Sequence, residues 1–79
     1  MAEAYVLLKV TPGYERNIVQ KLKDIPEIEI VNELYGEWDI ITKASVERMA
    51  DLDALLSDKM RKLEGVTLTS TMIVAAYKY

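Results

Sequence analysis

The chain alternates between two kinds of hydrophobic periodicity, and the order of this alternation limits the possible folds more than any other feature. Segments with a period of two, typical of strands, and segments with a period near 3.6, typical of helices, follow one another as strand, helix, strand, strand, helix, strand. The expected strands are 3–10, 27–35, 38–44 and 66–77, and the expected helices are 14–25 and 46–63. This order predicts an α+β fold of the ferredoxin-like type, in which two helices cover one face of a four-stranded antiparallel sheet.

Residues that begin and end helices agree with these boundaries. Thr11 is a suitable N-cap for the first helix, Pro12 suits its first position, and Pro26 stops it. Ser45 is expected to cap the second helix, and Gly65 is expected to follow its last turn. With no linker or low-complexity run among its 79 residues, the chain forms a single domain, residues 1–79.

The size and composition of the chain favour self-association. A domain of 79 residues buries only roughly 60% of the surface that its unfolded form exposes, so a monomer is marginally stable. The chain contains no cysteine and no histidine, and therefore lacks disulfides and the commonest metal ligands, yet 51% of its residues are hydrophobic. We expect the excess apolar surface to be buried against further copies of the chain.

The sheet face that the helices leave uncovered is also expected to be apolar. Both sets of alternating positions are apolar in three of the strands, and Tyr5, Leu7, Ile41 and Ile73 are candidates for the second face. A contiguous apolar face on a small protein usually marks an interface, so we expect a homo-oligomer whose dimers form sheet against sheet. Ordinary β-propensity is the alternative explanation.

Charge and hydropathy exclude several classes of partner. The net charge of −3 and the pI of about 4.9 argue against direct binding to nucleic acid, which needs clustered Lys and Arg. No segment approaches the ~20 apolar residues of a membrane span, and the N-terminus does not resemble a secretory signal. A cytoplasmic protein is therefore expected. The scarcity of Asn, Gln and Cys beside many Glu and Lys leans towards a thermophile.

The sequence lacks the side chains that most often act in catalysis. His and Cys, the best general base and the best nucleophile, are absent, and the chain has no Gly-rich phosphate loop. We therefore expect no enzyme activity, no catalytic residue, no metal site and no cofactor. A small dimeric enzyme acting on an apolar substrate inside its own fold stays open as an alternative.

Two short segments carry the candidate binding residues. The turn Gly36-Glu37-Trp38-Asp39 offers a carboxylate for an ammonium group and backbone N–H groups for a carboxylate. Thr69 and Thr71, spaced by two on a strand, point their hydroxyls to the same face. These groups suit a zwitterion, although an ordinary hairpin turn and a pair of strand threonines explain the same residues without any ligand.

The same segments carry a resemblance to a known family. The stretches AYVLLKVTPGYE, IPEIEIVNELYGEWDIITKA and LEGVTLTSTMIV resemble the ligand-binding half, or RAM domain, of the Lrp/AsnC (feast/famine) transcription regulators. The resemblance extends over nearly the whole chain. Its most specific elements are the Gly-x-aromatic-Asp turn and the Thr-x-Thr of the last strand.

The resemblance implies a ferredoxin-like domain of the dimeric α+β barrel type. It implies dimers that assemble into a ring and an amino-acid effector bound between dimers. Carried over by position, Gly36, Glu37, Trp38 and Asp39 would form one side of the pocket, and Thr69 and Thr71 would contribute to it from the last strand. Trp38 is bulkier than the family's usual aromatic residue, which affects side-chain selectivity.

Typical family members carry a helix-turn-helix domain before this part, whereas the first strand is expected almost at the start of this sequence, which leaves open that it is part of a longer regulator. A stand-alone domain that does not itself bind DNA is therefore expected, and helix-turn-helix relatives are possible partners. A structural assembly partner that binds no ligand is the remaining alternative.

Overall fold

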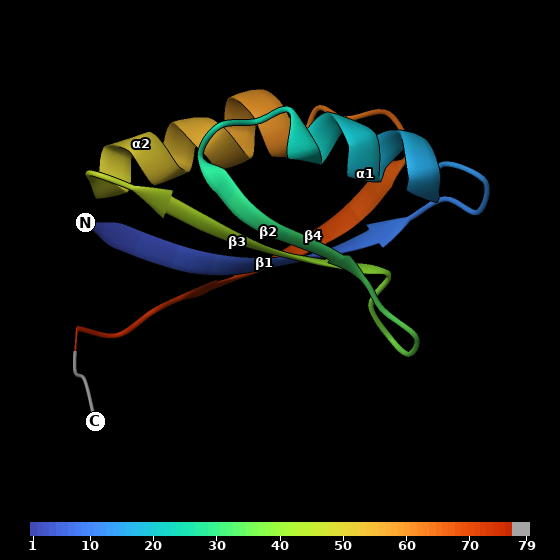
Figure 1. Ribbon diagram of the computed structural model, residues 1–79, viewed down its shortest axis with the longest axis horizontal. Coiled ribbons are helices and arrows are strands. Elements are labelled where there is room, and N and C mark those ends of the chain that lie inside the picture. The colour runs from blue at the N-terminus through green and yellow to red at the C-terminus, as the bar shows by residue number, and fades with distance from the viewer. Residues whose placement is uncertain (77–79) are drawn as a thin grey trace.

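The computed structural model describes residues 1–76 and has the predicted architecture. A four-stranded antiparallel sheet has the order β2-β3-β1-β4, and the helices α1 and α2 lie together on one side of it (Figure 1). The elements are β1 (Ala2–Val10), α1 (Glu15–Lys23), β2 (Ile28–Glu33), β3 (Ile40–Val46), α2 (Met49–Ala54), a π-helical segment η1 (Leu55–Met60) and β4 (Val66–Ile73). The ferredoxin-like β-α-β-β-α-β prediction is confirmed.

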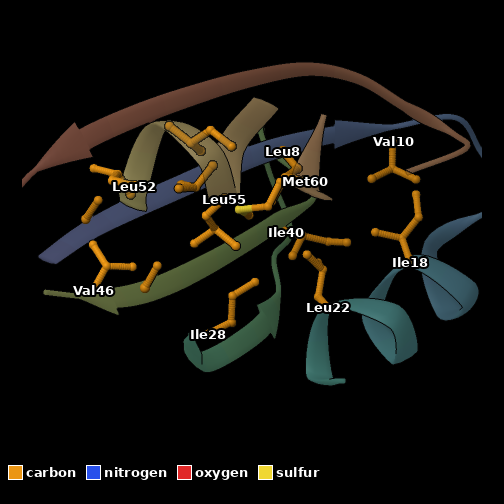
Figure 2. Packing of buried hydrophobic residues seen from close by; sticks show 14 residues of the cluster. Leu8, Val10, Ile18, Leu22, Ile28, Ile40, Val46, Leu52, Leu55 and Met60 are labelled. Carbon is orange, nitrogen blue, oxygen red and sulfur yellow. The ribbon is translucent and has the colours of Figure 1, made fainter. Parts of the chain in front are cut away.

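The hydrophobic core fills the space between the helices and one face of the sheet, called the covered face below. Alternate residues of β1 and β3 point into it, among them Leu8 and Ile40, which are both fully buried. Ile18 and Leu22 from α1 and Met60 from η1 close it from the other side (Figure 2). This packing follows from the period-two pattern of the strands meeting the helical pattern of α1 and α2.

The first helix is shorter than predicted, and its beginning differs. α1 starts at Glu15 with Tyr14 as its N-cap residue, so the predicted cap Thr11 and first position Pro12 were wrong. Residues 11–14 form a turn in which Tyr14 N–H donates to the Thr11 carbonyl (3.1 Å). Gly13 has a φ of +97°, which explains why the chain cannot be helical there.

The second helix also starts later than predicted, because its expected N-cap residue belongs to a strand of the sheet. Ser45 lies within β3, where its N–H donates to the Glu27 carbonyl (3.0 Å), and Arg48 is the N-cap residue instead. The Arg48 N–H donates to the Asp51 carboxylate (3.2 Å). From Leu55 the helix widens into η1, where Arg61 N–H reaches the Leu56 carbonyl (2.9 Å).

The strands likewise end earlier or later than predicted. β2 ends at Glu33 and β3 begins at Ile40, so Trp38 and Asp39 belong to the connecting loop. β4 ends at Ile73, and the end predicted at Tyr77 lies outside the described residues. No helix in the described part of the chain is long and apolar enough to cross a membrane.

The other face of the sheet, called the open face, carries no helix within residues 1–76 (Figure 1). Strand pairing places the following residues on it: Ile30 from β2, Ile41 and Lys43 from β3, Tyr5, Leu7 and Lys9 from β1, and Leu68, Ser70 and Met72 from β4. Ile73 was predicted here, but this prediction was wrong. It pairs with Ala4, a fully buried residue of the covered face.

Candidate functional site

The β2–β3 connection, which contains the candidate turn, is a short loop closed by one hydrogen bond. Leu34 N–H donates to the Asp39 carbonyl (2.8 Å), and residues 35–38 form the projecting tip. Gly36 has a φ of +130°, and a side-chain Cβ built there would meet no atom within 4 Å. The glycine is therefore needed for the backbone conformation, while the space around it is free.

Asp39 fastens this loop to the central strand β1. Its N–H donates to the Leu8 carbonyl (3.0 Å), and its Oδ2 accepts the Val10 N–H (2.7 Å). Because β3 has not yet begun at this point, the carboxylate replaces a backbone carbonyl and extends the ladder between β1 and β3. One oxygen of the candidate ammonium-binding group thus has a structural partner.

Trp38 is half-buried and lies near Lys9, a residue of the open face. The Lys9 Nζ is 5.7 Å from the centroid of its ring, in the range of a cation–π interaction. Glu37, its neighbour in the loop, is exposed, and Tyr35 is fully exposed. The loop therefore presents aromatic surface to its surroundings.

Thr69 and Thr71 both lie on the covered face. They share a face because residues two positions apart on a strand point to the same side. They pair with Leu8 and Val6, which point into the core. Both threonines are half-buried. Thr71 Oγ1 is buried without a hydrogen-bond partner among the described residues. A buried hydroxyl without a partner is unfavourable in a folded protein.

The turn and the threonines are not brought into one hollow within a single chain. Asp39 lines a hollow of about 440 Å³ between α1 and the β2–β3 loop, together with Gly13, Glu15, Arg16, Glu33, Leu34 and Tyr35. Thr69 and Thr71 are not among these residues. They lie on β4, on the other side of β1 from the loop.

Several residues of this region were missed by the sequence reasoning. Glu15 and Arg16 from α1 join the hollow, and Lys9 contacts Trp38. The Glu15 carboxylate itself accepts the Gly13 N–H (2.8 Å). The sequence signals of these residues, a helix start and an alternating strand, do not say which loop they will meet. Their roles depend on strand pairing, so only the tertiary structure reveals them.

Metal-binding groups are not gathered anywhere in residues 1–76. No cluster of three or more His, Cys, Asp or Glu side chains is arranged to hold an ion. The acidic side chains Glu15, Glu33 and Asp39 surround the hollow together with the Arg16 guanidinium. This mixture of charges suits a polar or zwitterionic molecule better than a metal ion.

Comparisons with a family model and with known proteins point to the same family. Residues 3–77 match the family model described as the Lrp/AsnC ligand binding domain. The HTH-type transcriptional regulator FL11 of Pyrococcus furiosus is 37% identical over 71 residues, which are 90% of this chain and 46% of that protein. The chain spans about half the length of the curated relatives it matches.

Solved structures of similar proteins have the same fold as this chain. The crystal structure of FFRP-DM1 is 36% identical with a TM-score of 0.92, over 95% of this chain and 100% of that one. The transcriptional regulator NMB0573 of Neisseria meningitidis, solved as an L-Met complex, is 18% identical with a TM-score of 0.86, over 99% of this chain and 53% of that one. This second likeness shows the fold alone.

Proposed function

Because the chain belongs to the Lrp/AsnC ligand-binding domain family, we propose that it is a regulatory domain that senses an amino acid. The observation that carries this proposal is the match of the family model to residues 3–77. NMB0573, which has the same fold, was solved with L-methionine. That complex supports an amino acid as the class of effector for this chain.

The effector is proposed to bind to the 36–39 turn and to Thr69 and Thr71. The free oxygen of the Asp39 carboxylate would receive the ligand's ammonium group, and the threonine hydroxyls and loop N–H groups its carboxylate. Gly36 and Glu37 shape the tip, and Trp38 limits the side chain. Since one chain keeps the two groups on opposite sides of β1, the pocket is proposed to lie between dimers, where two chains contribute to it.

Assembly is part of the proposal. Two open faces are proposed to pack against each other, because Leu7 and Ile41 pair at the centre of that face and Leu68 and Met72 are 54% and 47% exposed. Dimers would then form a ring, and a ligand that completes the pocket favours the ring. Helix-turn-helix regulators with a matching half, such as FL11, are proposed co-assembly partners.

A purely structural assembly domain is the second candidate. The hydrogen bond from Val10 N–H to the Asp39 carboxylate favours it, because this bond explains the aspartate without a ligand. An enzyme is not proposed, since the matched curated relatives are named as transcriptional regulators.

A thermal-shift screen of the purified protein against the twenty amino acids, each at millimolar concentration, tests the proposal. A ligand at ~100 times its dissociation constant stabilises the folded state by about 2.7 kcal/mol per site, which raises Tm visibly. A rise with one or a few amino acids is expected. The absence of any rise, for a protein that melts within range, would favour the structural assembly domain.

The variant Asp39→Asn sharpens this screen. Asparagine keeps an acceptor for the Val10 N–H but removes the charge, so the fold is expected to survive while ligand stabilisation is lost. Asp39→Ala is the poorer test because it also leaves the Val10 N–H without its partner. An unchanged ligand-induced shift in Asp39→Asn would exclude this carboxylate from the pocket.

A further inference from the structure

Three consecutive residues of β1 hold two consecutive residues of the β2–β3 loop. The Leu8 carbonyl accepts the Asp39 N–H (3.0 Å), and the Val10 N–H donates to Asp39 Oδ2 (2.7 Å). Between these two contacts, the Lys9 side chain places its Nζ 5.7 Å from the centroid of the Trp38 ring. The outer two contacts fix Asp39, whereas the middle one acts on the tryptophan ring.

The loop itself gives the Trp38 ring little support. Tyr35, Gly36 and Glu37, which precede it, are all exposed, and Gly36 has no side chain to pack against the ring. An ammonium group over the face of an indole is attracted by the negative charge of that face. The orientation of the ring therefore depends on the contact with Lys9.

The position of Lys9 does not depend on its side chain. Its carbonyl accepts the Thr67 hydroxyl (3.2 Å), and β1 lies between β3 and β4 in the sheet. Trp38, in contrast, lies outside the strands, in the loop between Glu33 and Ile40. Because the lysine backbone is held from both sides, Lys9 positions the ring, and the ring does not position Lys9.

We propose that Lys9 is a positioning residue that sets the size of the effector's side-chain subsite through Trp38. This inference rests on the proposed function, in which Asp39 receives the ammonium group of an amino acid and Trp38 limits its side chain. With an ammonium group over one face, the indole keeps one orientation beside Asp39, and the effector's side chain meets a rigid wall. Without that group the ring rotates more freely, and larger side chains are admitted. Lys9 acts only through the ring.

Three variants separate this role from a general effect of charge. Lys9→Met keeps an unbranched apolar stem and removes the ammonium group, whereas Lys9→Arg keeps a cation that stacks on aromatic rings. Lys43→Met is the matched control. Lys43 also lies on the open face, and its Nζ is 5.8 Å from the centroid of the Tyr5 ring, so this variant loses the same kind of contact at a different ring.

The first measurement needs no effector. Trp38 is the only tryptophan of the chain, so time-resolved fluorescence anisotropy reports the motion of this one ring on the nanosecond timescale. Faster motion of the ring is expected in Lys9→Met, and motion like that of the wild type in Lys9→Arg and Lys43→Met. Unchanged motion of the ring in Lys9→Met would overturn the positioning role.

The second measurement is a thermal-shift titration of the wild type and the three variants with each of the twenty amino acids. For those that bind, the preference for the smaller over the larger side chains is expected to fall by roughly two- to fivefold in Lys9→Met, the value of an exposed cation–π contact. Lys9→Arg should restore the preference, and Lys43→Met should leave it unchanged.

The titration also distinguishes failure of this inference from failure of the proposed function. If the wild type responds to an amino acid but Lys9→Met keeps the same preference, the role of Lys9 is overturned and the sensing function stands. If no amino acid raises Tm of the wild type, the sensing function fails, and the subsite fails with it.

Discussion

Both faces of the sheet carry apolar residues, but these residues have opposite surroundings. On β1, Leu8 is fully buried on the covered face, whereas its neighbour Leu7 on the open face keeps part of its surface exposed. On β3, Ile40 and Ile41 differ in the same way. The apolar side chains of the covered face are buried within a single chain, whereas those of the open face stay partly exposed. Folding of one chain therefore uses one half of the apolar pattern, and the other half is the surface that the proposed association would bury.

The largest effect is expected from Leu8→Ala on the covered face. The side chain is fully buried in the core, so the cavity left behind should lower the free energy of unfolding by about 2–5 kcal/mol. Denaturant unfolding followed by circular dichroism measures this. Leu7→Ala, one residue away on the open face, is the matched control and should cost less in dilute protein. Equal losses in the two variants would remove the distinction between the faces.

A charge on the open face should act on assembly instead of folding. Leu7→Lys places an ammonium group at the centre of the proposed dimer contact, and burying it unpaired should weaken self-association by about 3 kcal/mol, roughly a hundredfold. Light scattering coupled to size-exclusion chromatography measures the mass, and circular dichroism checks that the fold is retained. An unchanged mass in a folded variant would show that the open face is not the interface.

Two threonines on the covered face allow a finer comparison. Thr42 is fully buried and its Oγ1 donates to the Val6 carbonyl (3.1 Å), whereas the buried Thr71 Oγ1 has no partner among the described residues. Thr42→Val should lower the free energy of unfolding by about 1 kcal/mol because it removes a hydrogen bond. Thr71→Val should leave it unchanged or raise it.

The threonine comparison is made by thermal unfolding in dilute protein without added amino acid. A larger loss for Thr71→Val than for Thr42→Val would indicate that Thr71 already has a bonding partner in solution.

The smallest effect concerns the ion pair on the open face. Lys43 Nζ is 3.6 Å from the Glu3 carboxylate and 5.8 Å from the centroid of the Tyr5 ring, and both charged side chains keep contact with solvent. Glu3→Gln should therefore change the free energy of unfolding by less than about 1 kcal/mol, and high salt should remove the difference. Urea titrations at low and high salt measure it. A larger, salt-independent loss would mean that the pair is buried in an assembly.

The candidate site was only partly accessible from the sequence. The motif at residues 36–39 and the Thr-x-Thr spacing were visible, as was the need of Gly36 for a positive φ. The hydrogen bond between Asp39 and Val10, and the contact of Lys9 with Trp38, were not. Both join residues about thirty positions apart, and no local pattern indicates which strand residue meets which loop residue.

The sequence by itself determined the order of elements, the buried residues of β1 and β3, and the absence of groups for disulfides, because periodicity and composition are local properties of the chain. The tertiary structure decided which face each β4 residue occupies, because the pairing of β4 with β1 sets its register. It also kept Ser45 in the sheet, where pairing with neighbouring strands outweighed its preference for a helix cap. In each case a contact between distant segments outweighed a local preference.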